Sequence, residues 1–179
     1  KDEVIDLEAL RYRKIKKLMK AKVSSKNILI LGDISCSITS SLLKRIYPMV
    51  NNGCKWSFKP HPIKSYEIDK DFKKHISLLY KPLNQVISDF DTIICSDAST
   101  VCIESFMSGL KTIIVKSKAR LNRSALKDEE SASFVNTTED IIKALSSINS
   151  NGPNKDYFYQ SEDLYRWNKL LEKINIIKV

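Results

Sequence analysis

Short apolar segments alternate with amphipathic segments along most of the chain. Six segments, most of them nearly continuous apolar runs typical of buried strands, predict strands at residues 27–33, 54–60, 76–80, 91–97, 111–117 and 133–137. Helical spacing of apolar positions predicts helices at residues 42–50, 82–90, 99–109 and 137–148. Strands that alternate with helices predict a Rossmann-like α/β domain, with a mostly parallel sheet and helices on both faces.

One further helix is predicted at each end of the chain. Residues 4–22 place most apolar side chains on one half of a helical wheel and most Lys and Arg on the other. Residues 161–177 repeat this pattern. The expected organisation is a basic connecting helix in 1–26, a ligand-binding domain in 27–150, and a C-terminal loop and helix in 151–179 that packs on the domain.

Charge narrows the possible partners. The 179 residues hold 30 Lys and Arg against 21 Asp and Glu, a net charge of +9. Eight of the basic residues lie in 11–26, which contains no acid, and the rest of the chain is nearly balanced. Such a run suits an anionic membrane surface or nucleic acid. Its single aromatic residue, Tyr12, disfavours a base-stacking platform, so we expect membrane docking and no nucleic acid.

The cysteines and the apolar runs restrict location and metal chemistry. The four cysteines form no CxxC pair and have no histidine at ligand spacing, so no metal site is predicted. Cys95 lies within an apolar run, as expected of a buried thiol in a reducing compartment. No apolar run approaches the roughly 18 residues of a membrane span. We therefore expect a cytoplasmic protein, docked at most peripherally at the inner face of the membrane.

Candidate chemistry gathers where three predicted strands end, because ligands of such sheets bind at the carboxyl ends of the strands. Residues 96–100 read SDAST, with Ser99 expected to cap the next helix. Hydroxyls of Ser99 and Thr100 beside the first helical N–H groups predict an anion site, although such residues also serve simply as caps. Glu104 follows on the same helix, where its carboxylate can accept hydrogen bonds from a ribose diol or remain exposed.

The other two strand ends carry a constrained histidine and a hydroxyl-rich loop. His61 lies between two prolines in KPHP, which restricts its backbone and suits contact with a phosphate or acid catalysis. His75 lies among charged residues and is expected to be solvated. The loop GDISCSITS offers Gly32 for close backbone approach and Ser35 among its hydroxyls. Neither GxGxxG nor a P-loop occurs.

The order of these motifs resembles the C-terminal half of a GT-B glycosyltransferase, over roughly residues 27–150. KPHP followed by SDAST is similar to the bacterial sialyltransferase pattern, and related pairs occur in transferases of bacterial surface polymers. The resemblance implies that Gly32 and Ser35 line the donor site, that His61 contacts the donor phosphate, and that Ser99 and Thr100 bind it. It implies that Glu104 faces the ribose.

The resemblance also implies a co-substrate and a second domain. The nucleotide-sugar, with CMP or another nucleotide, would be a co-substrate, and no cofactor or metal is implied. A GT-B enzyme needs a second domain for the acceptor, so the chain would be the donor half of a longer enzyme of surface polysaccharide biosynthesis. Ser96 stands where retaining members often have Glu, which disfavours that subgroup.

Two other functions remain open at this stage. A sugar-nucleotide epimerase shares the fold but usually has glycines where this chain has Ala98, Ser99 and Thr100. A basic α/β module that binds nucleic acid or membrane through residues 11–26 is the other possibility.

Overall fold

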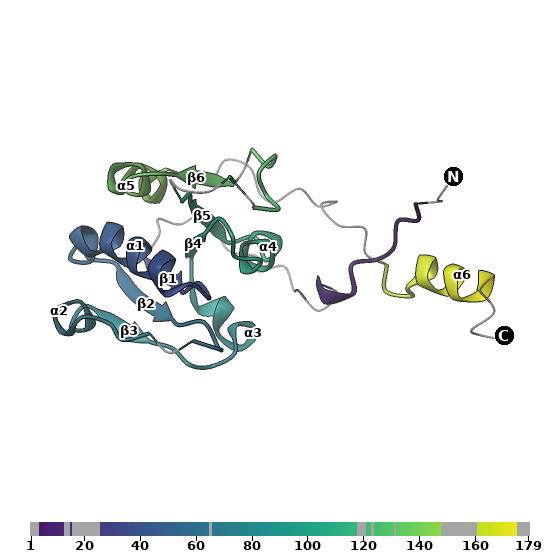
Figure 1. Cartoon of the computed structure of the whole chain (residues 1–179), viewed down its shortest axis with the longest axis horizontal. Coiled ribbons are helices and arrows are strands. Elements are labelled where there is room, and N and C mark those ends of the chain that lie inside the picture. The colour runs from purple at the N-terminus through teal and green to yellow at the C-terminus, as the bar shows by residue number, and fades with distance from the viewer. Residues whose placement is uncertain are drawn as a thin grey trace.

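The computed structural model describes residues 4–12, 15, 26–64, 66–117, 121–122, 124–130, 132–147 and 161–174. Its six strands form one parallel sheet in the order β3-β2-β1-β4-β5-β6 (Figure 1). The strands are β1 (Asn27–Leu31), β2 (Lys55–Lys59), β3 (Ile76–Leu78), β4 (Thr92–Ser96), β5 (Lys111–Val115) and β6 (Ser133–Val135). The predicted fold class is confirmed.

Helices cover both faces of this sheet. The α-helices are α1 (Cys36–Ile46), α2 (Lys70–Lys73), α3 (Leu83–Val86), α4 (Val101–Met107), α5 (Thr138–Ser146) and α6 (Tyr165–Lys173). Short 3-10 helices are η1 (Leu10–Tyr12), η2 (Tyr47–Met49) and η3 (Ile87–Asp89). The connection from β1 leads to β2 on one side, and β4 returns to the other side of β1. The topological switch point, where such folds bind ligands, therefore lies between β1 and β4.

Alternating side chains of β1 place two hydrophobic cores on opposite faces of the sheet. Ile28 and Ile30 pack with apolar residues of α1, α2 and α5, whereas Leu29 and Leu31 pack with those of α3 and α4. A strand buried on both faces has little room for polar residues, which explains its continuous apolar sequence. Cys95 on β4 is fully buried in the second core, as predicted.

Helix α1 begins earlier than predicted. It starts at Cys36 rather than at 42, so the hydroxyl-rich stretch is its first half and not a loop. Thr39 is the reason: its buried hydroxyl accepts a hydrogen bond from the main-chain N–H of Asp33 and donates to the Asp33 carbonyl. Thr39 thereby fixes the first turns of α1 to the end of β1.

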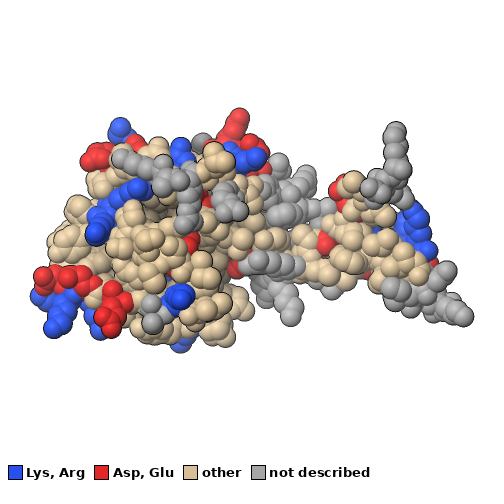
Figure 2. Space-filling model, in the orientation of Figure 1, with Lys and Arg blue, Asp and Glu red and all other residues tan. Residues whose placement is uncertain are grey.

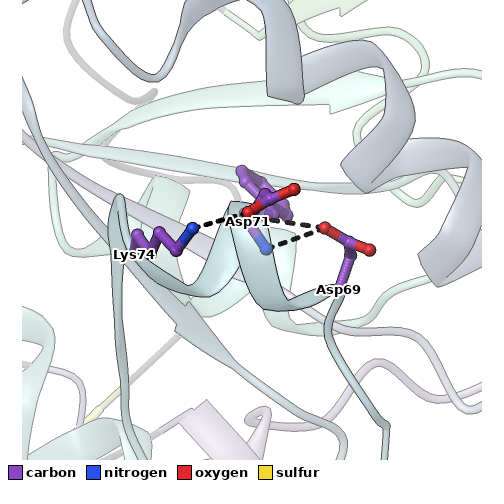
Figure 3. Close-up of polar contacts among 4 residues, drawn as sticks. Asp69, Asp71 and Lys74 are labelled. Atoms are coloured by element: carbon purple, nitrogen blue, oxygen red, sulfur yellow. Dashed lines mark hydrogen bonds and ion pairs between the residues drawn. The ribbon is translucent and has the colours of Figure 1, made fainter.

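Helix α2 was missed in the sequence because it is only four residues long. The Asp69 carboxylate accepts hydrogen bonds from the N–H groups of Asp71 and Phe72, and Lys74 forms an ion pair with Asp71 (Figure 3). Such an N-cap stabilises a helix end by about 0.5–2 kcal/mol. Helix α5 begins with a capping box between Thr137 and Asp140.

The predicted helix over 4–22 is wrong for residues 4–9, which have no regular structure. Residues 13–14 and 16–25, with most of the basic run, lie outside the described residues. The extended course of 4–9 has a physical cause in Glu8, which is 4% exposed. Its carboxylate accepts hydrogen bonds from the main-chain N–H groups of Arg166 and Trp167, so it caps α6 rather than continuing a helix.

Helix α6 is shorter than the predicted 161–177 and begins after Leu164, which has left-handed backbone geometry with φ of 54°. The Trp167 indole N–H donates to the Glu8 carbonyl. Figure 1 shows α6 away from the sheet, beside the purple N-terminal segment that contains Glu8. Desolvation raises the pKa of Glu8, but the hydrogen bonds from Arg166, Trp167 and Ser161 outweigh it and hold that pKa below its ordinary value.

Candidate functional site

A cleft of about 1110 Å³ opens at the carboxyl ends of β1, β2 and β4, at the topological switch point. Its lining includes all six residues that the sequence singled out for ligand binding: Gly32, Ser35, His61, Ser99, Thr100 and Glu104. They come from three segments far apart in the chain. The fold thus brings together the three strand ends that the motifs marked.

Gly32 lets the loops after β1 and β2 lie against each other. Its N–H donates to the carbonyl of Lys59 at 2.9 Å. A Cβ atom at this position would lie 3.2 Å from the main-chain nitrogen of His61 and 3.2 Å from Cα of Pro60. Glycine is therefore required by close approach and not by backbone conformation, and its absence of a side chain sets the position of the KPHP loop.

Asp33 is a member of the site that the sequence analysis missed. It lines the cleft and is 8% exposed. Its carboxylate accepts hydrogen bonds from the Ser35 N–H at 2.8 Å and from the Ser96 hydroxyl at 2.5 Å. The second bond joins the end of β1 to the end of β4. The Gly-Asp pair at the strand end was the available signal, but nothing in the sequence showed that Ser96 would face it.

His61 is half-buried, and its ring orientation is set by a local contact. Its Nδ1 accepts a hydrogen bond from the Ile63 N–H at 3.3 Å. A neutral imidazole that accepts at Nδ1 carries its proton on Nε2, which is then a donor. The Lys64 N–H donates to the His61 carbonyl and tightens the turn. His75 is exposed and does not line the cleft, as predicted.

Helix α4 forms another wall of the cleft, and its N-cap residue differs from the one predicted. Thr100, not Ser99, is the N-cap residue, and its side chain makes no capping hydrogen bond. The Ser99 N–H instead donates to the Ser96 carbonyl at 3.2 Å, which makes a turn before the helix. Both residues nonetheless line the cleft, with Glu104 half-buried one turn further along α4. Gly109, with φ of 81°, lies just after the end of α4 at Met107.

The charges of the cleft are divided between its sides. Lys59 ends β2, and His61 and Lys64 follow it, whereas the acids Asp33 and Glu104 belong to the loop after β1 and to α4. Burial lowers the pKa of Lys59. The two lysines were not predicted from the sequence, because surface lysines are common and only their position relative to His61 makes them part of the site.

The β3 side of the cleft is apolar and aromatic. Tyr80, Pro82 and Leu83 line it, and Tyr80 is 74% exposed. An exposed ring beside a polar cleft can stack on a planar ligand group. These residues follow the short strand β3, and their sequence carried no recognisable motif.

Neither a metal-binding cluster nor a membrane-spanning helix is present in the described residues. Within the part of the chain that the structure describes, no group of three or more His, Cys, Asp or Glu side chains is placed to hold a metal ion. In the same residues no helix combines the length and apolarity needed to cross a bilayer.

Comparison with known proteins identifies the fold. No protein-family model and no curated protein matches the sequence. Solved structures do match: MurG of Acinetobacter baumannii (15% identity, TM-score 0.56, 82% of this chain and 52% of that one) and the spinosyn rhamnosyltransferase SpnG (13%, 0.55, 99% and 49%). SnogD, a glycosyltransferase from Streptomyces nogalater, matches at 11% identity and TM-score 0.53, over 74% of this chain and 37% of that one.

The chain spans between about a third and a half of these three glycosyltransferases. At such identities the likeness concerns the fold alone. The six-stranded parallel sheet with helices on both faces is the Rossmann-like α/β arrangement found in GT-B glycosyltransferases.

Proposed function

We propose that the cleft binds the nucleotide part of an activated sugar, and that the chain is the donor-binding half of a glycosyltransferase. One observation carries the proposal: residues selected from three separate strand ends line a single cleft at the switch point of the sheet. The GT-B-like fold supports it. Open α/β sheets bind nucleotides at this position.

The division of charge in the cleft supports a proposed position for each part of the ligand. A donor phosphate would lie toward Lys59, His61 and Lys64, with hydroxyls of Ser99 and Thr100 as neutral donors. Glu104 would accept hydrogen bonds from the ribose diol. Tyr80 would stack on the base. Asp33 would repel a phosphate and so confine it to the side of the cleft formed after β2.

The chemistry in this proposal is stabilisation of a leaving group. Sugar transfer breaks the bond between the anomeric carbon and the nucleotide phosphate, so negative charge develops on that phosphate. Fixed cations and hydrogen-bond donors that bind the developing charge lower the barrier. The acceptor and its base would come from a second domain, and the chain alone would bind nucleotide without transferring sugar.

The finer assignments follow from the motif resemblance and stay proposals. The donor would be CMP-activated or carry another nucleotide, and the product would be a bacterial surface polysaccharide. The enzyme would be cytoplasmic. The basic residues in 11–26 would hold it to anionic lipid at the inner face of the membrane.

A thermal-shift panel tests the proposal directly. The purified chain is heated with CMP, CDP, UMP, UDP, GDP or NAD at increasing concentration. A nucleotide at 100 times its Kd should add about 2.7 kcal/mol of stability. Glu104→Gln should weaken nucleosides and nucleotides alike, because its proposed partner is the ribose. If no nucleotide stabilises the chain, the donor-binding proposal is wrong.

A further inference from the structure

A second pocket lies at the same edge of the sheet but shares no lining residue with the cleft. This pocket, called here the α1 pocket, has a volume of about 180 Å³. It lies between α1 and the ends of β4 and β5, and is lined by Ser37, Ile38, Ser41, Leu42, Arg45, Ser96, Val115, Lys116 and Ser117. It suits a small polar molecule.

Two cations line the α1 pocket, and no acid does. The half-buried Arg45 donates from Nη1 to the carbonyl of Lys116 at 3.1 Å, which fixes the guanidinium against the loop after β5. Within the described residues neither Arg45 nor Lys116 forms an ion pair. A guanidinium has five N–H donors in a planar fork, so Arg45 retains donors that match the geometry of an oxyanion.

A neighbouring hollow extends this positive character past Arg45. It is lined by Ser37, Ser40, Ser41, Lys44, Arg45 and Thr138, so it shares two serines and the arginine with the α1 pocket. The Thr138 hydroxyl donates to the carbonyl of Arg45 and ties α5 to this turn of α1. Figure 2 shows Lys and Arg atoms on this face where α1 and α5 lie close together. Arg45 thus lies between two other cations, Lys44 and Lys116.

The end of the α1 pocket near Ser96 is lined by hydrogen-bond acceptors rather than by cations. The Ser96 hydroxyl donates to Asp33, so its oxygen can only accept a hydrogen bond from a ligand. The Ser117 N–H donates to the buried carboxylate of Asp97 at 3.3 Å. Acceptors and nearby carboxylates favour hydroxyl groups at this end and repel an anion. A ligand would therefore place its anion beside Arg45 and its hydroxyls toward Ser96.

We propose that the α1 pocket binds a small phosphate monoester of a polyol, separately from the nucleotide in the cleft. The phosphate lies beside Arg45 with Lys44 and Lys116 around it, and the hydroxylated carbons lie toward Ser96. Arg45 is the main determinant, because its position is fixed by Lys116 and both hollows include it.

Calorimetric titration with glycerol phosphate and with inorganic phosphate, at ionic strength held constant with NaCl, tests this site. Saturable binding of glycerol phosphate is expected, several-fold tighter than inorganic phosphate. Arg45→Gln and Lys116→Gln should each weaken it by tenfold or more. The exposed Lys73→Gln on α2 is the matched control and should change it less than twofold. Lys116→Gln keeps the main-chain carbonyl that Arg45 binds, so it decides the matter if Arg45→Gln does not fold.

Four outcomes would overturn the proposal. The first is the absence of saturable binding. The second is an equal loss in Arg45→Gln and Lys73→Gln, which would mean diffuse attraction to a basic protein. The third is a loss in His61→Ala with none in Arg45→Gln, which would place the phosphate in the cleft. Equal affinity for inorganic phosphate would refute selection of an ester. Nucleotide binding should be unchanged in Arg45→Gln, so the cleft is tested independently.

Discussion

The two walls of the cleft are built differently. The wall after β1 and β2 is rigid: Gly32 packs on the main chain of His61, and Asp33 is fixed through its carboxylate and its main chain. The wall from α4 is a helix of seven residues without a side-chain cap, preceded by the exposed Ala98 and Thr100. The contrast predicts that substitutions in the first wall affect both stability and binding, whereas those in the α4 wall affect binding alone.

The largest effect is expected from Gly32→Ala, which disrupts the rigid wall formed after β1 and β2. Gly32→Ala places a methyl group 3.2 Å from main-chain atoms of His61 and Pro60, so the loop after β2 must shift to admit it. Overpacking of this kind costs about 1–3 kcal/mol of stability. Nucleotide binding should also fall, because the KPHP loop shifts. Thermal unfolding and nucleotide titration measure the two effects.

Gly53→Ala is the matched control for that variant. Gly53 has φ of 81° and no atom within 4 Å of an added Cβ, so alanine there introduces backbone strain without a clash. Stability should fall, but nucleotide affinity should stay at the parental value. Equal losses of affinity in the two variants would show that Gly32 has no specific role in the cleft.

Asp33→Asn tests whether the link between β1 and β4 holds the rigid wall. The amide keeps the shape, but its single oxygen can accept from only one of the two donors, the Ser35 N–H or the Ser96 hydroxyl, and its NH2 group faces the other. Hydrogen bonds to a charged group contribute about 1.5–3 kcal/mol, and most of that stability should be lost in denaturant unfolding. The exposed Asp128→Asn should leave stability unchanged. An equally stable Asp33→Asn protein would contradict this assignment.

Substitutions of His61 test whether its Nε2 donates a hydrogen bond to the ligand. His61→Ala should weaken nucleotide binding by about 1.5–3 kcal/mol if Nε2 donates to a charged phosphate. His61→Gln should recover part of this loss, because its amide also carries N–H donors. His75→Ala is the control and should have no effect. Titration of all three variants with the best nucleotide of the panel gives the comparison.

Lys59 should make nucleotide affinity depend on pH. Its pKa is lowered by burial, so its positive charge is lost at a lower pH than the usual value of about 10.4. Nucleotide affinity should therefore decline as pH rises, beginning below that value. Lys59→Arg keeps its charge and should bind with little change over the same range. Parallel declines in the two proteins would show that Lys59 is not near the phosphate.

The smallest effect is expected in the α4 wall. Ser99→Ala removes one neutral hydroxyl donor and should weaken nucleotide binding by about 0.5–1.5 kcal/mol, without a change in stability. If Ser99→Ala weakens binding more than His61→Ala, the α4 wall and not the β2 segment holds the phosphate. The comparison between the walls would then be reversed.

The sequence was sufficient to predict the sheet and six residues that line the cleft, but not the hydrogen bonds that join the strand ends. Continuous apolar strands and the short motifs after them identified the fold class and six cleft residues, because each signal is local. The bond between Asp33 and Ser96 spans 63 positions and joins strands whose pairing no local pattern specifies. The early start of α1 was hidden because serine and threonine suit both loops and helix starts.

At the two ends of the chain, local sequence patterns predict even less of the structure. Residues 4–9 have the apolar spacing of a helix, yet Glu8 leaves that pattern to cap α6, 158 positions away. A carboxylate and a distant helix N-terminus each have many possible partners in the sequence, so only the folded chain identifies the pair.

The contact between Glu8 and α6 has a consequence for the order of folding. Closing a loop of this length carries a larger entropy cost than forming the neighbouring strand pairs of the sheet, so it is expected late in folding. The Trp167 indole donates to the Glu8 carbonyl and changes its surroundings when the contact forms. Trp56 is buried in the sheet at 3% exposure and reports the earlier step. The two tryptophans are therefore natural fluorescent reporters of the first and last stages of refolding.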